Sequence, residues 1–356
     1  MINKIFNADV LSDKGLARLP DQSVHCIVTS PPYFGLRDYG VEGQIGLEET
    51  PDQYVQKLVH VFREARRVLR DDGTVWLNLG DSYASSSKNR TEDQAIKNST
   101  LQGSLKTQSQ ILKQQSKIVS GLKPKDLIGI PWRVAFALQA DGWYLRQDIV
   151  WAKPNPMPES VTDRCTKSHE YIFLLSKSQR YYYDHVAIMQ DVKMSSVERL
   201  MQDVENQEGN MKAKASWNGS SFDKGKTGEM MATRGGLRKS GNKERKDRPG
   251  APENNGAHQK GSVPWEGMKA NKRSVWTVTT KPFKEAHFAT FPEDLIVDCI
   301  KAGCPEDGIV LDPFMGAGTT ALVARKLNRN YVGFELNRSY IEIAEKRLQK
   351  ELGMFV

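Results

Sequence analysis

Residues 309–320 read IVLDPFMGAGTT, an apolar run that ends in an acid and continues into a glycine-rich turn. The run predicts a buried strand over 309–311, and the residues after the turn predict a helix that starts at Thr319. Gly316 and Gly318 let the backbone approach a ligand closely, and the helix offers amide donors at its N-terminus. Such a strand–turn–helix unit is typical of the ligand-binding edge of an α/β sheet.

Two acids lie at strand ends around this turn. Asp312 precedes the first glycine by four residues, where a carboxylate can hold the ammonium group of a methionine moiety. Glu335 ends the next predicted strand, 331–334, and can accept two hydrogen bonds from ribose hydroxyls. The segment is therefore expected to hold an adenosine-containing cofactor. NAD is an alternative, because residues 316–321 also fit the G-x-G-x-x-G/A pattern; so is a turn that needs its glycines for packing alone.

A second informative segment is residues 29–33, which read TSPPY after another apolar run, 26–28. Consecutive prolines fix the backbone and lack N–H donors, so the carbonyls of Ser30 and Pro31 stay free to accept. Tyr33 supplies a flat surface, and stacking on it does not need the hydroxyl. The combination fits a planar ring with an exocyclic amine, whose lone pair is localised for attack on a methyl group when its N–H groups are held. This chemistry requires no metal and no covalent enzyme intermediate. Taken alone, the segment also fits a proline-stiffened turn with a buried tyrosine.

Together the two segments resemble the motifs of DNA amino-methyltransferases that use S-adenosylmethionine. The catalytic motif precedes the cofactor motif, which is the order of the beta group, a circular permutation of the usual one. The resemblance implies a Rossmann-like α/β fold with a seven-stranded, mostly parallel sheet and a β-hairpin. It also implies one set of catalytic residues and one set of cofactor-binding residues. The catalytic set is Ser30, Pro31, Pro32 and Tyr33, and the cofactor set is Asp9, Phe288, Thr290, Asp312, Phe314, Gly316, Gly318, Thr319 and Glu335.

The resemblance also favours one target base over another, through the first residue of the catalytic motif. In the family, Asp or Asn there is usual for adenine-N6 enzymes and Ser is common for cytosine-N4 enzymes, so Ser30 favours cytosine N4. Adenine N6 is the nearest alternative. Double-stranded DNA is the implied partner, and its target base has to leave the duplex. More distant alternatives are an RNA or protein-glutamine methyltransferase, an NAD-linked oxidoreductase, and a catalytically silent nucleic-acid-binding protein, which would not need an intact cofactor turn.

The charge of the chain is concentrated in two polar segments. The net charge is +8 over 356 residues, but residues 85–125 carry +6 and residues 211–248 carry +7, which leaves the rest at −5. Such segments suit a polyanion, and solvated loops are the alternative. Residues 1–185, with a polar insertion at 84–125, and residues 276–356 are expected to form the catalytic and cofactor parts of one methyltransferase domain. Residues 186–275 are expected to recognise the target sequence.

Other features bound the setting. There is no run of about 18 apolar residues, so no membrane span is expected, and the four cysteines lack metal-like CxxC spacing, which fits a reducing cytoplasm. The resemblance implies a role in restriction–modification or phage self-protection, with the oligomeric state open. The remaining predicted elements are strands at 4–9, 23–29, 74–79, 145–151 and 170–176, a hairpin continued by 181–183, and helices at 51–69 (ended by Gly73), 131–140, 293–300 and 338–350.

Overall fold

The computed structural model describes residues 2–36, 38–84, 122–192, 269–281 and 291–353. The chain divides into two compact units. Residues 1–188 and 273–356 form one of them, and residues 189–272 form the other. In the second unit, β6 (Gln190–Asp191) pairs antiparallel with β7 (Lys269–Ala270), and an ion pair joins Asp191 to Lys269.

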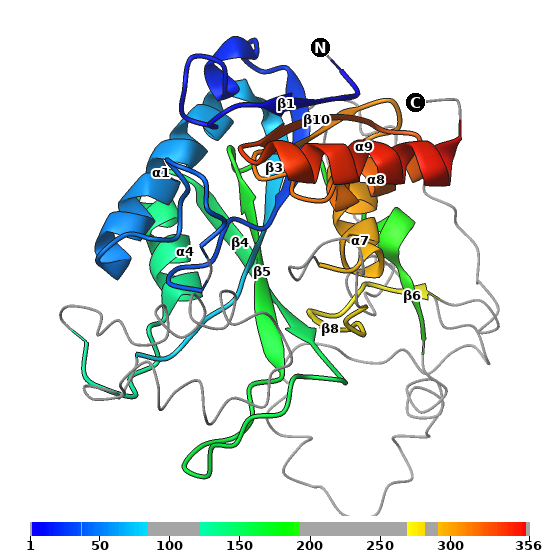
Figure 1. Cartoon of the computed structure of the whole chain (residues 1–356). Coiled ribbons are helices and arrows are strands. Elements are labelled where there is room, and N and C mark those ends of the chain that lie inside the picture. The colour runs from blue at the N-terminus through cyan, green and yellow to red at the C-terminus, as the bar shows by residue number, and fades with distance from the viewer. Residues whose placement is uncertain (1, 37, 85–121, 193–268, 282–290, 354–356) are drawn as a thin grey trace, which may run out of the picture. The chain divides into compact units, whose positions relative to one another are not determined.

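The first unit is built on a sheet that has eight strands within the described residues (Figure 1). Their order is β1 (Lys4–Asn7), β10 (Asn330–Glu335), β9 (Ile309–Asp312), β2 (Val24–Thr29), β3 (Leu69–Leu79), β5 (His169–Ser176), β4 (Tyr144–Ala152) and β8 (Val275–Thr277). Neighbouring strands are parallel except where β5 pairs antiparallel with β3 and β4. The predicted α/β fold with a mostly parallel sheet and a hairpin, formed by β4 and β5, is confirmed. The short edge strand β8 makes one strand more than the seven expected.

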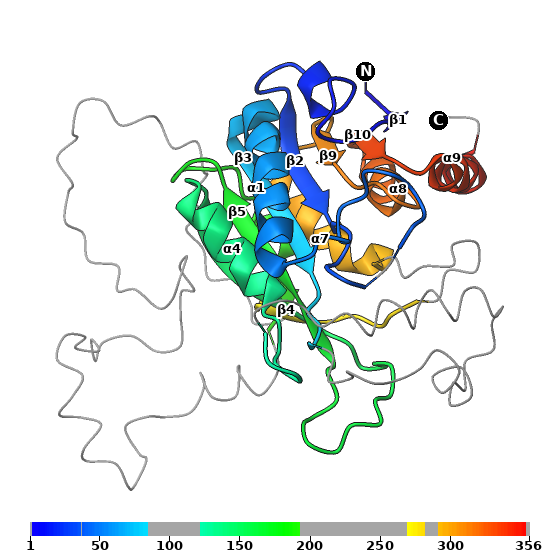
Figure 2. The same cartoon turned by 60° about the vertical axis from the view of Figure 1, so that its left-hand side comes forward.

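Helices cover both faces of this sheet (Figures 1 and 2). The helices α1 (Pro51–Val68) and α4 (Ile130–Ala140) pack on one face, and α7 (Glu293–Gly303), α8 (Thr319–Lys326) and α9 (Arg338–Leu352) pack on the other. The side chain of Ile27 in β2 joins the first core, whereas those of Cys26 and Val28 join the second. The strand therefore reads as a continuous apolar run because both of its faces are buried.

The first helix begins as predicted and ends earlier. Thr50 and Gln53 form a capping box, with the Gln53 amide 3.2 Å from the Thr50 hydroxyl and Pro51 at the first position. Leu69, which the helical spacing assigns to α1, is extended and pairs with Val24 of β2. Gly73 does not stop the helix; it lies inside β3, where an added Cβ would come within 2.6 Å of the Leu69 side chain.

The prediction that Tyr181–Tyr183 continue a hairpin is wrong. These residues form a coil, and the Tyr182 amide donates a single hydrogen bond to the carbonyl oxygen of Asp72 in β3, at 2.8 Å. The Tyr183 ring stacks on Trp76 at a centroid distance of 6.2 Å. Aromatic packing on the sheet, not a strand ladder, therefore explains the tyrosine run.

The connections of the sheet create one crevice. From β9 the chain runs through α8 to β10, whereas from β2 it runs through α1 to β3 in the opposite direction along the sheet. β9 and β2 are neighbours, so the strand order reverses between them (Figure 2). In open α/β sheets, ligands bind beyond the carboxyl ends of strands at such a point.

Candidate active site

A cavity of about 810 Å³ opens beyond the carboxyl ends of β9 and β2. Most of the predicted site residues line it. They are Asp9, Ser30, Pro31, Pro32, Tyr33, Asp312, Phe314, Gly316, Thr319 and Glu335. Gly318 is not among the lining residues, and Phe288 and Thr290 lie outside the described residues. The structure thus brings together two motifs that are about 280 positions apart in the sequence.

Asp312 is the buried junction between the two motifs. Its Oδ1 accepts from the Thr29 hydroxyl at 2.6 Å and from the Phe314 amide at 3.0 Å, and its Oδ2 accepts from the Thr320 hydroxyl at 2.6 Å. The carboxylate thus ties the end of β2 to the cofactor turn. Burial raises the pKa of Asp312 to about 6, although these hydrogen bonds lower it in part.

Glu335, at the end of the neighbouring strand β10, also accepts hydrogen bonds from backbone amides. Its Oε2 accepts from the Gly316 amide at 2.9 Å, and its Oε1 accepts from the Asn337 amide at 2.8 Å. Burial raises the pKa of Glu335, and the negative charge of Asp312 adds to that rise. Asp9 follows the end of β1 by two residues, and its Oδ1 accepts from the Leu11 amide at 2.9 Å. Three carboxylates therefore border the cofactor side of the cavity.

The glycines of the turn have different tasks. Gly316 has a φ of +53° and borders the cavity. Gly318 has a φ of +78°, and an added Cβ would lie 2.7 Å from the Cβ of Ala344 in α9. The missing side chain of Gly318 thus allows the close packing of this turn against α9, and its contact with a cofactor stays a prediction.

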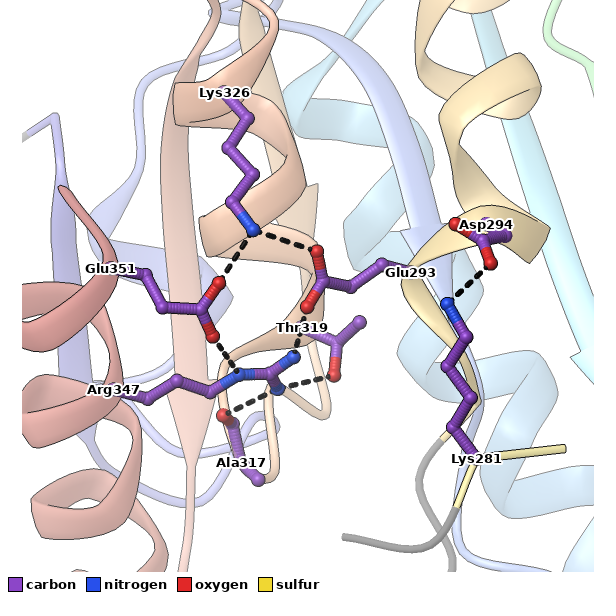
Figure 3. Close-up of polar contacts among 8 residues, drawn as sticks. All are labelled: Lys281, Glu293, Asp294, Ala317, Thr319, Lys326, Arg347 and Glu351. Carbon is purple, nitrogen blue, oxygen red and sulfur yellow. Dashed lines mark hydrogen bonds and ion pairs between the residues drawn. The ribbon is translucent and has the colours of Figure 1, made fainter.

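Arg347 of α9 contacts the glycine-rich turn through its guanidinium group (Figure 3). Its guanidinium donates to the Thr319 hydroxyl at 3.0 Å and lies 3.5 Å from the carbonyl oxygen of Ala317. It also pairs with Glu293 of α7 at 2.7 Å and with Glu351 at 3.4 Å. Lys326 of α8 contacts both carboxylates and closes a ring of four charged side chains. Motif reading missed Arg347, since a charged residue at helical spacing carries no signal of such a role.

The proline loop keeps acceptors available. The carbonyl of Pro32 accepts from the Tyr54 hydroxyl at 2.8 Å, which fixes the loop on α1. Among the residues that the structure describes, none donates a hydrogen bond to the carbonyl of Pro31. Ser30 and Pro31 both border the cavity, so both can accept from a ligand that enters it.

Three residues that sequence reasoning assigned no role complete this side of the cavity. Asn78 is the last residue but one of β3, Lys153 follows β4, and Glu170 is the second residue of β5, so all three lie at the same edge of the sheet as Tyr33. The Tyr33 hydroxyl lies 2.8 Å from Oε2 of Glu170. A polar residue at a strand end was the available signal, but the sequence does not say which distant strand ends meet.

Comparison with known proteins gives the family. The profile of a DNA methylase family that covers N6 and N4 enzymes matches residues 24–346. The chain belongs to this family. It is 43% identical over 348 residues to the type II methyltransferase M.Cfr9I of Citrobacter freundii, covering 98% of this chain and 88% of the relative. The chain is thus a DNA methyltransferase of the N4/N6 family, and an NAD-linked oxidoreductase is set aside.

Two solved structures share the fold. The cytosine-N4-specific PvuII DNA methyltransferase has a TM-score of 0.55 at 15% identity, over 97% of this chain and 85% of that one. A DNA modification methylase from Thermus thermophilus, solved with S-adenosyl-L-methionine, has a TM-score of 0.50 at 18% identity, over 96% of this chain and 91% of that one. At these identities the likeness concerns the fold alone.

Within the residues that the structure describes, no helix is both long and apolar enough to cross a membrane, and no three His, Cys, Asp or Glu side chains are grouped to hold a metal ion. The cavity does fit an adenosine-containing cofactor. Its volume lies in the range of small-molecule sites, and its acids stand at the ends of β1, β9 and β10, with a positive-φ glycine at the turn.

Proposed function

We propose that this chain transfers a methyl group from S-adenosylmethionine to the exocyclic amine of a flipped base in double-stranded DNA, with cytosine N4 as the target. One observation carries the proposal. The cofactor turn and the TSPPY loop open onto a single cavity at neighbouring strand ends, and the hydrogen bond between Thr29 and Asp312 joins them at 2.6 Å. A cofactor and a base bound in the two halves are therefore neighbours.

On the cofactor side, the acids match the groups of S-adenosylmethionine. That cofactor supplies a methyl group on a positively charged sulfur. Asp312 provides negative charge for the ammonium group, and Glu335 accepts from the ribose hydroxyls. Asp9 faces the adenine amino group, and Phe314 and Thr319 border the same half. Phe288 and Thr290 are proposed on the family resemblance alone.

On the base side, the loop supplies acceptors and a stacking surface. The Ser30 hydroxyl and the Pro31 carbonyl hold the N–H groups of the amine, and the base stacks on Tyr33. Holding these N–H groups out of the ring plane localises the nitrogen lone pair, so positioning and fixed dipoles supply the catalysis. Ser30 at the head of the motif favours cytosine N4, and adenine N6 is the second candidate.

Nucleoside analysis tests the proposal. DNA from cells that express the protein is digested to nucleosides and separated by mass. N4-methylcytosine is the expected product, absent when Tyr33→Ala replaces the wild type. N6-methyladenine instead would reassign the base and leave the enzyme class intact. The absence of both, with the protein folded and bound to S-adenosylmethionine, would overturn the proposal.

The biological setting follows from the DNA substrate. Residues 186–275 are proposed to recognise the target sequence, and the basic residues at 85–125 and 211–248 to neutralise phosphates in the cytoplasm. A role in restriction–modification predicts that the modified DNA resists a type II endonuclease. DNA from expressing cells can be challenged with a panel of type II endonucleases, because the chain is 43% identical to a type II methyltransferase over 98% of its length.

A further inference from the structure

Beside the Ser30–Pro31 acceptors lies a polar cluster that the transfer reaction does not itself require. The Tyr33 hydroxyl is 2.8 Å from Oε2 of Glu170 and 3.2 Å from Oδ1 of Asn78, and the Ser30 hydroxyl approaches it at 3.4 Å. A phenol has one proton, and a carboxylate is its stronger acceptor. Burial and the negative charge of Glu170 raise the pKa of Tyr33 well above its ordinary value, so the hydroxyl stays protonated and donates.

Glu170 is itself fixed from two other sides. Its Oε1 forms an ion pair with Lys153, and both side chains are less than one-fifth exposed. The Asn78 amide lies 3.3 Å from Oε2 of Glu170 and 3.1 Å from the carbonyl oxygen of Tyr171. The ammonium of Lys153 also lies over the Trp151 ring, at 4.2 Å from its centroid. The acceptor for the tyrosine thus has little freedom to move.

The ring of Tyr33 is also confined at its edge. A Cβ added to Gly80, which directly follows β3, would lie 2.4 Å from Cε2 of Tyr33, so the backbone of Gly80 touches the ring. Backbone on one side and a hydrogen bond at the hydroxyl together leave one orientation of the ring. Stacking alone would need neither.

We infer that Glu170 and Lys153 are positioning residues that fix the plane of Tyr33 and so set the slot in which the flipped base stacks. The inference rests on the proposed function, because it concerns the base half of the same cavity. It contradicts a purely stacking tyrosine, for which phenylalanine would serve equally well. Small displacements of a reacting group cost large factors in rate, so loss of this anchor should slow the reaction itself, not cofactor binding.

The test is a double-mutant cycle with Tyr33→Phe, Glu170→Gln and the pair together. The readouts are the single-turnover rate of methyl transfer at saturating DNA, the Kd of S-adenosylmethionine, the melting temperature, and the fluorescence of 2-aminopurine at the target position. Each single change should lower the rate by roughly tenfold or more, the loss expected for a hydrogen bond to a charged group. The double variant should be no slower than the slower single one, and cofactor Kd should stay within about twofold of the wild type.

Two further variants separate positioning from general structure. Lys153→Arg keeps the ion pair and should retain most of the rate, whereas Lys153→Met should match Glu170→Gln. Glu159→Gln is the control, because Glu159 pairs with Arg164 at 2.7 Å on the neighbouring loop and does not border the cavity. It should change nothing.

Different results would refute the further inference and the proposed function. Independent, multiplying losses in the double variant, or full activity of Tyr33→Phe, would overturn the inference while the wild type still methylates DNA. A wild type that binds the cofactor and methylates no DNA would refute the proposed function instead. Tyr33→Phe removes a single oxygen and keeps the ring, so the test remains decisive if Glu170→Gln fails to fold.

Discussion

Asp312 is a buried acid with a pKa of about 6, against an ordinary value of 3.8. The folded protein therefore holds a proton there that the unfolded chain has lost above about pH 4. As pH rises from about 4 to 6, this site lowers the free energy of unfolding by about 3 kcal/mol, and above pH 6 it adds no further change. Asp312→Asn removes the titrating group, so the variant should gain in stability relative to the wild type across that window. Denaturant unfolding at pH 4.5, 5.5 and 7 measures the difference.

The same carboxyl predicts how cofactor binding depends on pH. An ammonium group held by Asp312 needs the ionised form, so the affinity for S-adenosylmethionine should rise as pH increases through about 6. The Asn variant should bind at least about tenfold more weakly at pH 7, which is about 1.4 kcal/mol, and should lose this pH dependence. Calorimetry with both proteins decides it. Equal affinity of the two proteins at pH 7 would restrict Asp312 to its structural hydrogen bonds with Thr29 and Thr320.

A substitution at Gly80 tests whether the position of the Tyr33 ring matters, without removing its hydroxyl group. Alanine there places a Cβ 2.4 Å from Cε2 of Tyr33, and the three nearest atoms all belong to that ring, so the ring has to move. We expect methyl transfer to fall by at least about tenfold with unchanged cofactor affinity. Ser82→Ala, two residues further along, is the control. A Gly80→Ala enzyme with normal turnover would show that the ring position is not critical.

The ring of charges around Arg347 joins three helices to one turn (Figure 3). Because Arg347 is 9% exposed and contacts α7, α9 and the turn, Arg347→Met removes both the hydrogen bond to Thr319 and the pairing with Glu293. Breaking a mostly buried pair should cost about 2 kcal/mol or more of unfolding free energy, and the loosened turn should weaken cofactor binding. Thermal unfolding and calorimetry measure the two effects.

Arg338→Met provides the matched control on α9. Arg338 is 66% exposed and makes one (i, i+4) pair with Glu342, so its loss should change stability by less than about 0.5 kcal/mol. If Arg347→Met had a lower melting temperature but bound the cofactor normally, the ring of charges would contribute to stability only and not to cofactor binding.

Local sequence signals predicted most of the elements because each signal acts within a few residues. The capping box at Thr50 and the run before Asp312 fixed a helix start and a strand end correctly. The helix end was misread because Leu69 fits the helical spacing as well as the first position of β3. The packing of Gly318 against Ala344 was likewise not predicted, since the sequence does not distinguish a glycine that packs against another helix from one that contacts a ligand.

The sequence predicted the residues on the cofactor side of the cavity, but on the base side it predicted only the proline loop. Both motifs are local, because each reflects the backbone conformation that a few consecutive residues have to adopt. Tyr33 and Glu170 are separated by 137 positions, and their contact follows from the order β2-β3-β5, which no short motif encodes. The antiparallel strand β5 brings its first residues to the edge where the parallel strands end. This topology makes Glu170 part of the site.

Charge distribution over the entire chain gives the last prediction. Residues 211–248 lie outside the described residues and carry eleven Lys and Arg against four Asp and Glu, whereas the chain without both basic segments is acidic. Deleting 211–248 should leave S-adenosylmethionine affinity unchanged, because the cofactor residues lie elsewhere in the sequence. DNA affinity should fall, and the slope of log affinity against log salt should flatten by ~0.9 for each phosphate that the protein no longer neutralises. Sequence-specific methylation should disappear.

A variant of the same length, with the eleven Lys and Arg of this segment replaced by Gln, separates two reasons for such a loss. If the segment only neutralises phosphates, the variant should weaken all DNA about equally and keep its preference for the target site at low salt, because phosphate contacts carry no sequence information. If its basic side chains also read bases, the preference itself should fall. A deletion that still modifies the same site with an unchanged salt slope would exclude both roles. Recognition would then have to come from residues 84–125 or from the parts of 186–275 that flank the deletion.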